Sequence, residues 1–151
     1  MSQNLPIVIL NPGGTQWANN LTAAGMVKAL PAGALTQPGK LRRINVQAPG
    51  SSGEFAFYDV ALIGAYSSTT QYYPGQGVTS GGNVYLCILP SLGNAVSNGT
   101  YWTEQNPVLY FPYNATGIYA GALLAPDWPF DNGIYLGTVP SGSPILNCSF
   151  D

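Results

Sequence analysis

Few residues of this 151-residue chain could carry out acid–base, nucleophilic or metal chemistry. The sequence contains no histidine, which excludes the most frequent general base, the Ser-His-Asp triad and imidazole metal ligands. The acidic residues are Glu54, Asp59, Glu104, Asp127, Asp131 and Asp151. Asp127 and Asp131 flank the corner PDWPFDN, where aspartate commonly bonds the backbone of a turn. We therefore expect a non-enzymatic protein without cofactor or metal, and interpret both aspartates as turn residues rather than as a hydrolytic or calcium-binding pair.

The chain is poor in charge, since Asp, Glu, Lys and Arg make up 7% of it, against about a quarter in typical proteins. The basic residues are Lys28, Lys40, Arg42 and Arg43, and the formal net charge is −2. Three of them lie within 40–43, which is too small a basic patch for nucleic acid. An exterior of Asn, Ser, Thr, Gln and Tyr suits contact with another surface, although it also fits an ordinary β-protein with an uncharged polar exterior.

Neither a secretory signal nor a membrane-spanning helix is expected. The apolar run Leu5–Leu10 is short, is interrupted by proline and has no basic residue before it. The longest nearly continuous apolar run, Gly117–Ala125, is too short to cross a bilayer as a helix. We therefore interpret Cys87 and Cys148 as buried free thiols on strands, with a bridge between them as the less favoured alternative.

Glycine and proline, with 19 and 13 residues, leave few windows long enough for a helix. We expect an all-β fold, an antiparallel β-sandwich of the jelly-roll kind. Leu5–Leu10 is predicted as a first strand ended by the turn Asn11–Gly14, and Gln16–Ala24 as a short helical turn or an extended arm lying on a neighbour. Ile134–Val139 and Ile145–Phe150 are predicted to form a last hairpin.

The stretch Lys40–Leu62 is predicted as a hairpin closed by the loop PGSSG. Its first strand alternates between apolar and polar residues over Arg43–Ala48, as a half-buried strand does. The second strand is apolar on both faces, with Phe55 and Phe57 on one and Tyr58 on the other. A strand of this kind needs cover on both sides. We predict that another protein chain covers the second face, and that Phe55, Phe57 and Tyr58 lie at this protein interface.

The composition changes within 64–106, which contains a single charged residue, Glu104. This stretch also contains a small hairpin, with Val78 and Val84–Ile88 on either side of a Gly-Gly turn. We therefore predict a sandwich frame with an N-terminal arm, and an insert. The frame is 1–63 and 107–151, and the inserted hairpin module is 64–106.

The insert carries five residues in a recurring order, Tyr73, Gly75, Val78, Tyr85 and Trp102. This order resembles the family 5/12 carbohydrate-binding module, a small β-hairpin module known from chitinases and also found in phage virion proteins. Two positions depart from the family pattern. Its Gly-Asp pair is Gly-Gln here, and its opening aromatic is replaced at best by Tyr66.

The resemblance implies that Tyr72, Tyr73 or Trp102 stacks on the sugar rings of a cell-surface glycan. The alternative is that the aromatic residues form the insert's own small core, since about forty residues bury little area otherwise. For Tyr85 and Trp102 we favour this alternative. For Tyr72 and Tyr73 both interpretations remain open.

Three segments of the frame, Pro38–Val46, Phe57–Asp59 and Trp128–Tyr135, read PGKLRRINV, FYD and WPFDNGIY. They resemble a recurrent pattern in small structural proteins of tailed bacteriophages. The resemblance implies a β-sandwich virion component of the decoration, cement or head-fibre kind. The pattern is physically consistent, because Asn132-Gly133 is a favoured turn pair and Phe130 before it can enter the core as the chain turns.

We therefore expect a virion structural protein, a capsid decoration or cement protein on the outer capsid surface, assembled in the host cytoplasm. Its predicted partners are the major capsid protein and further copies of itself, as a dimer or trimer, without nucleic acid or membrane. It would stabilise the shell by burying apolar area across joints between capsid subunits. The alternatives are a glycan-binding adhesin of a head fibre or tail, which uses the insert, and a carbohydrate-binding module of a secreted enzyme, which the missing export signal disfavours.

Overall fold

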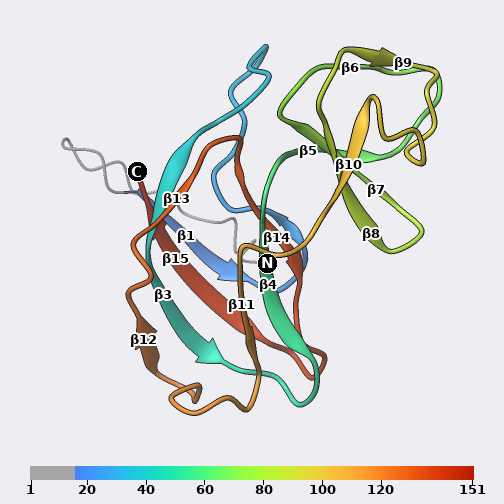
Figure 1. The fold of residues 1–151 in the computed structure, drawn as a ribbon. Helices are drawn as coiled ribbons and strands as arrows, with labels where there is room; N and C mark the ends of the chain where they lie inside the picture. Colours follow the sequence, from blue (N-terminus) through green and yellow to red (C-terminus); the bar gives the residue numbers. More distant parts are fainter. Residues whose placement is uncertain (1–15) are drawn as a thin grey trace, which may run out of the picture.

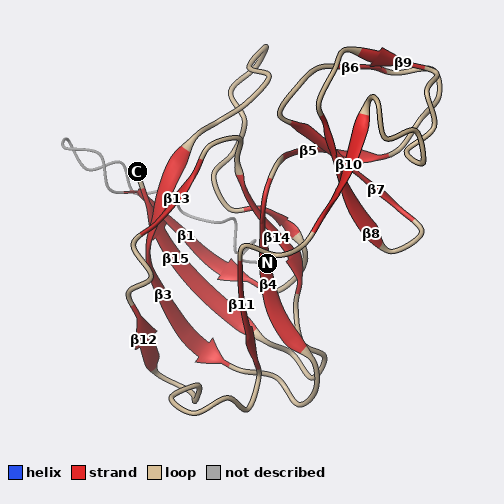
Figure 2. Cartoon of the chain, in the orientation of Figure 1, coloured by secondary structure: helices blue, strands red, loops and turns tan. Residues whose placement is uncertain are grey.

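The computed structural model describes residues 16–151, and this part of the chain consists of strands, turns and loops (Figure 2). Its strands are β1 (Gln16–Leu21), β2 (Gly25–Met26), β3 (Gly39–Ala48), β4 (Glu54–Asp59), β5 (Ala61–Ala65), β6 (Gln71–Tyr72), β7 (Gln76–Ser80), β8 (Asn83–Cys87), β9 (Ser91–Leu92), β10 (Trp102–Gln105), β11 (Leu109–Pro112), β12 (Ala122–Leu124), β13 (Trp128–Phe130), β14 (Ile134–Thr138) and β15 (Ile145–Phe150). Within 16–151 there is no helix long and apolar enough to span a membrane. The all-β prediction is confirmed.

Two antiparallel sheets form the frame and face each other (Figure 1). Sheet A has the strand order β1-β15-β3-β12, and β13 also pairs with β3. Sheet B has the order β11-β4-β14-β2. One hydrophobic core fills the space between them, as the β-sandwich prediction requires. Its fully buried side chains include Leu41, Ile44, Val46, Phe55, Phe57, Ile134, Leu136, Leu146 and Cys148.

The long strand β3 shows the alternation that the sequence predicts, with a register shift near each end. Ile44 and Val46 are buried between the sheets, whereas Gln47 is exposed. Leu41 is also buried, although it lies three residues before Ile44. The reason is a bulge, since the register of β3 against β15 slips by one residue between Leu41 and Arg43.

Both hairpins predicted for the frame are wrong, because in each case the two strands belong to different sheets. β3 lies in sheet A and β4 in sheet B, while β14 lies in sheet B and β15 in sheet A. The two connecting loops cross between the sheets and bond to each other: the N–H of Ser51 donates to the Ser141 oxygen, and the N–H of Ser141 to the Ser52 oxygen, both at 2.8 Å. Gly50 (φ +84°) permits this approach, since a Cβ there would lie 2.5 Å from the Ser141 oxygen.

The described part of the N-terminal arm is a strand of the frame. β1 pairs with β15 of the same chain, with Gln16 opposite Phe150 and Ala18 opposite Cys148. The expectation of a helical turn, or of an arm lying on a neighbour, is therefore wrong for β1. The predicted strand Leu5–Leu10 lies outside the described residues.

Residues 61–105, here called the module, form a further four-stranded sheet with the order β10-β8-β7-β5, in which β5 runs parallel to β7. The short ribbon β6–β9 lies at its far end (Figure 1). The predicted β7–β8 hairpin is confirmed, and its turn residues Gly81 and Gly82 both have positive φ. The sheet begins before residue 64, because Ala61 already pairs with Gln76.

Candidate functional site

The second apolar face of β4 is covered by the module of the same chain. Val84 and Leu86 of β8 pack in one cluster with Tyr58 and Tyr135, which lie side by side on the outer face of sheet B. The rings of Tyr58 and Tyr135 are 6.1 Å apart. The contact is close, since a Cβ at Gly77 would lie 2.7 Å from the Cβ of Val60. The module therefore packs directly on the frame.

This packing corrects the predicted protein interface. Phe55 and Phe57 are 0% exposed, and their ring centroids lie 5.1 and 6.5 Å from that of Phe111 inside the sandwich core. Tyr58 is half-buried against Tyr135 and the module. The sequence pattern was right that β4 needs cover on both sides, but this chain supplies that cover itself. Phe55 and Phe57 offer no surface to a partner.

Two of the three predicted sugar-stacking residues belong to a small aromatic core inside the module. Tyr72 and Trp102 are each 2% exposed, their ring centroids are 5.2 Å apart, and Tyr66 packs edge-on to Trp102 at 5.9 Å. The polar atoms of these rings are occupied: Trp102 Nε1 and the Tyr66 hydroxyl both donate to the Asn94 oxygen at 3.0 Å, and the Tyr72 hydroxyl accepts from the Ser67 N–H at 2.9 Å. Neither Tyr72 nor Trp102 has a free ring face for a sugar.

The Gly-Gln departure from the family pattern has a structural explanation. Gln76 is buried, and its Oε1 accepts a hydrogen bond of 2.9 Å from the backbone N–H of Tyr73. The backbone N–H of Gln76 donates back to the Tyr73 oxygen at 3.1 Å. Gly75, with φ +92°, forms the bend between them. A glutamine oxygen thus closes this turn.

Tyr73 is the predicted sugar-stacking residue that remains accessible, with 41% of its surface exposed. On the β6–β9 ribbon, Tyr72 lies opposite Ser91 and both are buried, whereas Tyr73, the residue that follows β6, is exposed. Leu89 and Leu92 are exposed at the same end of the module. Because 60–103 contains no charged residue, this end is uncharged.

The outer face of sheet A is a second exposed surface, on the side of the sandwich away from the module (Figure 1). It is mainly amide and apolar in character, with the exposed Arg43 as a charge on the same face of β3 as Asn45. Leu123, Asn45 and Asn147 lie opposite one another across β12, β3 and β15, and therefore share a face. Leu123 is 58% exposed. The amides are linked, since Asn147 Nδ2 donates to Gln47 Oε1 at 3.4 Å and Asn147 Oδ1 accepts from the Asn20 N–H at 2.8 Å. The alternation predicted over Arg43–Ala48 is consistent with an outward Asn45 and Gln47, but the sequence assigned them no role.

Two acidic residues at the PDWPFDN corner and beside it, Asp127 and Asp151, form ion pairs. Asp127 forms ion pairs with Arg42 (Nη1–Oδ1, 2.7 Å) and Lys40 (Nζ–Oδ2, 3.2 Å), and Arg42 also pairs with Asp151. The Arg42 guanidinium, followed by the Lys40 ammonium, lowers the pKa of Asp127, and Asp151 followed by Asp127 raises the pKa of Arg42. Within 16–151, no three His, Cys, Asp or Glu residues are grouped so as to hold a metal ion.

Asp59 joins two of the segments that resemble the virion pattern. Its carboxylate accepts hydrogen bonds from the backbone N–H groups of Asp131 (3.0 Å), Asn132 (2.7 Å) and Gly133 (3.3 Å). These three residues connect β13 of sheet A to β14 of sheet B. The end of β4 therefore fixes the point at which the chain crosses between the two sheets.

Comparisons of the chain with models of protein families, with curated proteins and with solved structures find no match.

Proposed function

We propose that this chain is a non-enzymatic structural protein of a tailed-bacteriophage virion, which binds the outside of the capsid shell as a decoration protein. The observation that carries the proposal is the corner at Asp59. The three segments that resemble the virion pattern make up the architecture of the frame: one is β3, which lies between β15 and β12 in sheet A, and the other two meet through the Asp59 carboxylate. A chance likeness of short motifs would not be expected to concentrate on residues that hold one another in place.

The contact face in this proposal is the outer face of sheet A. It replaces the interface expected at Phe55 and Phe57, which are enclosed in the core. The row formed by Leu123, Asn45 and Asn147 is uncharged, so covering these three residues does not bury a charge. Arg43, exposed on the same face, needs water or an acidic partner at the edge of the contact. Buried apolar area contributes about 25 cal/mol per Å², and many copies on one shell multiply a weak contact.

The test is binding of the purified protein to capsid shells assembled without it, measured by co-sedimentation together with the melting temperature of the shell. We expect Leu123→Arg on sheet A to weaken binding at least tenfold. Leu89→Arg, on the exposed end of the module, is the matched control and should bind as the unsubstituted protein does. Shells that bind no protein, or that bind both variants equally, would contradict the proposal.

A second candidate function, glycan binding by the module, is favoured by the exposure of Tyr73 beside two buried aromatic residues. An exposed tyrosine on an uncharged surface is a platform on which a pyranose ring can stack. A glycan array probed with the protein and with Tyr73→Ala tests it. Tyr110→Ala removes a more exposed tyrosine ring from the frame and serves as the control. Binding that persists in Tyr73→Ala, or that is absent throughout, excludes this function.

A further inference from the structure

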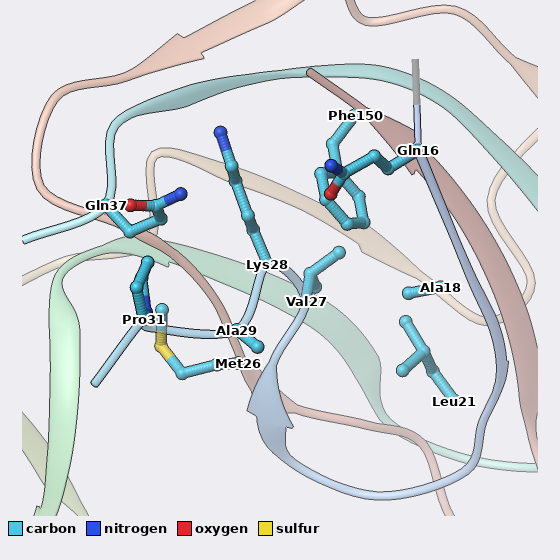
Figure 3. Close-up of a pocket in the computed structure, with 10 residues that line it drawn as sticks. All are labelled: Gln16, Ala18, Leu21, Met26, Val27, Lys28, Ala29, Pro31, Gln37 and Phe150. Atoms are coloured by element: carbon cyan, nitrogen blue, oxygen red, sulfur yellow. The ribbon is translucent and has the colours of Figure 1, made fainter. Parts of the chain in front are cut away.

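The cavity between β1 and the segment that follows β2 offers no free acid, base or nucleophile among the described residues that line it (Figure 3). Its volume is about 340 Å³, and Lys28 is the one charged residue of this lining. The Lys28 ammonium donates to the backbone oxygens of Pro38 and Asp151 at 2.9 and 2.8 Å. A group that can react without a partner lies instead in the module, and it is the side-chain amide of Asn98.

The chain contains two Asn-Gly pairs, Asn98-Gly99 and Asn132-Gly133. In such a pair the backbone nitrogen of the glycine can attack the amide carbon of the asparagine, because glycine has no side chain to block the approach. The two pairs lie in opposite surroundings. Asn98 and Gly99 are exposed in the loop between β9 and β10, whereas Gly133 is buried where β13 leads into β14.

Hydrogen bonds and close packing hold the pair between β13 and β14 in place. The N–H of Gly133 donates to Asp59 Oδ1 at 3.3 Å, and Asn132 Nδ2 donates to the Asp59 backbone oxygen at 3.4 Å. The space around the glycine is also occupied, since a Cβ at Gly133 would lie 2.7 Å from the Val60 oxygen. The nitrogen of Gly133 therefore cannot turn towards the amide carbon of Asn132 unless these bonds break.

The pair in the module has none of these restraints on its glycine. Within 16–151, the N–H of Gly99 has no hydrogen-bond acceptor, and a Cβ at Gly99 would meet nothing within 4 Å. Asn98 Oδ1 accepts a hydrogen bond of 3.1 Å from the N–H of Thr100. A donor at this oxygen stabilises the negative charge that develops on it when a nucleophile attacks the amide carbon. The loop thus combines a free nucleophile with an activated amide.

We propose that Asn98 is a site of spontaneous deamidation. Hydroxide removes the proton of the Gly99 N–H, and the nitrogen forms a bond to Asn98 Cγ. The bond between Cγ and Nδ2 breaks, and Nδ2 takes a proton from water and leaves as ammonia, so that a succinimide ring remains. Water then opens the ring at either of its carbonyl carbons and leaves aspartate or isoaspartate at position 98.

The reaction changes the turn that holds Trp102. The backbone oxygen of Asn98 accepts hydrogen bonds from the N–H groups of Tyr101 and Trp102 at 3.0 and 3.1 Å. In isoaspartate this carbonyl group becomes a free carboxylate, and the main chain runs through the former side chain and is longer by a carbon atom. Either product also puts a negative charge into 60–103, which has none. Deamidation should therefore loosen the aromatic core around Trp102.

Peptide mapping by mass spectrometry measures the reaction in the full native chain, incubated at 37 °C and pH 9. Asn98 should deamidate at least roughly tenfold faster than Asn132, because the hydrogen bond of Gly133 to the Asp59 carboxylate must break first at Asn132. Gly99→Ala, whose Cβ meets nothing within 4 Å, should slow the reaction at Asn98 several-fold and leave the rate at Asn132 unchanged. Equal rates at the two asparagines of the native protein would overturn the proposal.

Unfolding the chain separates the effect of the fold from that of the local sequence. In urea the two Asn-Gly pairs should react at similar rates, because Gly133 is then as free as Gly99. A difference as large as in the native protein would show that the fold does not select Asn98, and would overturn the proposal.

The melting temperature tests the effect on the module. After incubation of the native protein, it should fall as the deamidated fraction of Asn98 rises. Gly99→Ala, treated in the same way for the same time, should lose less. An equal loss in both proteins, or none in a fully deamidated sample, would contradict the role assigned to the turn that holds Trp102.

Discussion

Asp59 Oδ1 accepts a hydrogen bond of 2.7 Å from the backbone N–H of Asn132, a residue 73 positions further along the chain. The other carboxylate oxygen accepts from the N–H of Asp131 at 3.0 Å. The bonds converge on a sharp change of direction, where the chain leaves sheet A and enters sheet B. One side chain at the end of β4 thus determines how the two sheets are connected at this end of the sandwich.

Removal of this carboxylate should destabilise the whole frame. Asp59→Ala leaves three backbone N–H groups without their acceptor, and a hydrogen bond to a charged group is worth about 1.5–3 kcal/mol. We expect the free energy of unfolding in urea to fall by about 2–3 kcal/mol, since water can replace part of the loss. Glu104→Ala removes an exposed carboxylate from β10 and should cost less than about 0.5 kcal/mol. If the two variants unfold alike, the carboxylate does not hold the corner.

The two loop crossings show where local sequence information was insufficient. The loop PGSSG has the residues of a hairpin, and the same proline and positive-φ glycines also allow a crossing between sheets. The choice depends on distant partners, because β3 pairs with β15 and β4 pairs with β14. The alternation along β3 and the Gly81-Gly82 turn were predictable, since each depends on neighbouring residues alone.

Packing of the module on the frame depends on glycine at position 77. A Cβ there would lie 2.7 Å from the Cβ of Val60, which is fully buried and cannot move away easily. Gly77→Ala should therefore destabilise the protein by about 1–3 kcal/mol, the usual cost of overpacking. Gly99→Ala is the matched control, because a Cβ at Gly99 would meet nothing within 4 Å.

Thermal unfolding of the two glycine variants gives the comparison. Limited proteolysis then shows whether cleavage within 61–105 of Gly77→Ala becomes faster, as it should if the module separates from sheet B. A melting temperature of Gly77→Ala no lower than that of Gly99→Ala would mean that the contact between β7 and Val60 is loose.

The candidate site illustrates a second limit of sequence analysis. Tyr72 and Tyr73 are adjacent and chemically identical, yet one is buried and the other, just after the end of β6, is exposed. Which of them points inward is set by the pairing of Tyr72 with Ser91 and by the contact of its ring with Trp102. The small-core interpretation of Trp102 could be reached from the sequence, since a module of about forty residues needs such a ring to fold.

Trp102 should matter for the stability of the module, and Tyr73 should not. Trp102→Ala removes a buried ring from the aromatic core together with the hydrogen bond to the Asn94 oxygen, and should cost about 3–5 kcal/mol. Tyr73→Ala should stay within about 0.5 kcal/mol of the unsubstituted protein. Near-UV circular dichroism during thermal unfolding measures both effects. A stable, well-folded Trp102→Ala variant would argue against the aromatic core as the basis of the module's fold.

Both cysteines should be inert in the folded protein. Cys148 lies in the sandwich core, where burial raises the pKa of its thiol to about 12, and burial also raises the pKa of Cys87. At pH 8 a thiol with a pKa of about 12 is ionised to roughly one part in ten thousand, and the thiolate is the reactive form. Ellman's reagent should therefore react with no thiol in the native protein and with both after denaturation.

Because the pKa of Cys148 is raised on folding, the stability of the protein should fall as the pH rises above the ordinary pKa of a thiol. The unfolded chain releases the thiol proton near its ordinary pKa, about 8.5, whereas the folded chain retains it up to about 12. Stability contributed by the protonated thiol is therefore fully present below about pH 8.5 and is lost progressively as the pH rises towards 12. Between pH 8.5 and 10.5, the melting temperature of Cys148→Ala should fall less steeply than that of the unsubstituted protein. At pH 7 the variant should melt at a lower temperature, because the substitution leaves a space in the core. Parallel pH profiles of the two proteins would show that the thiol is more accessible to water than its position between the sheets implies.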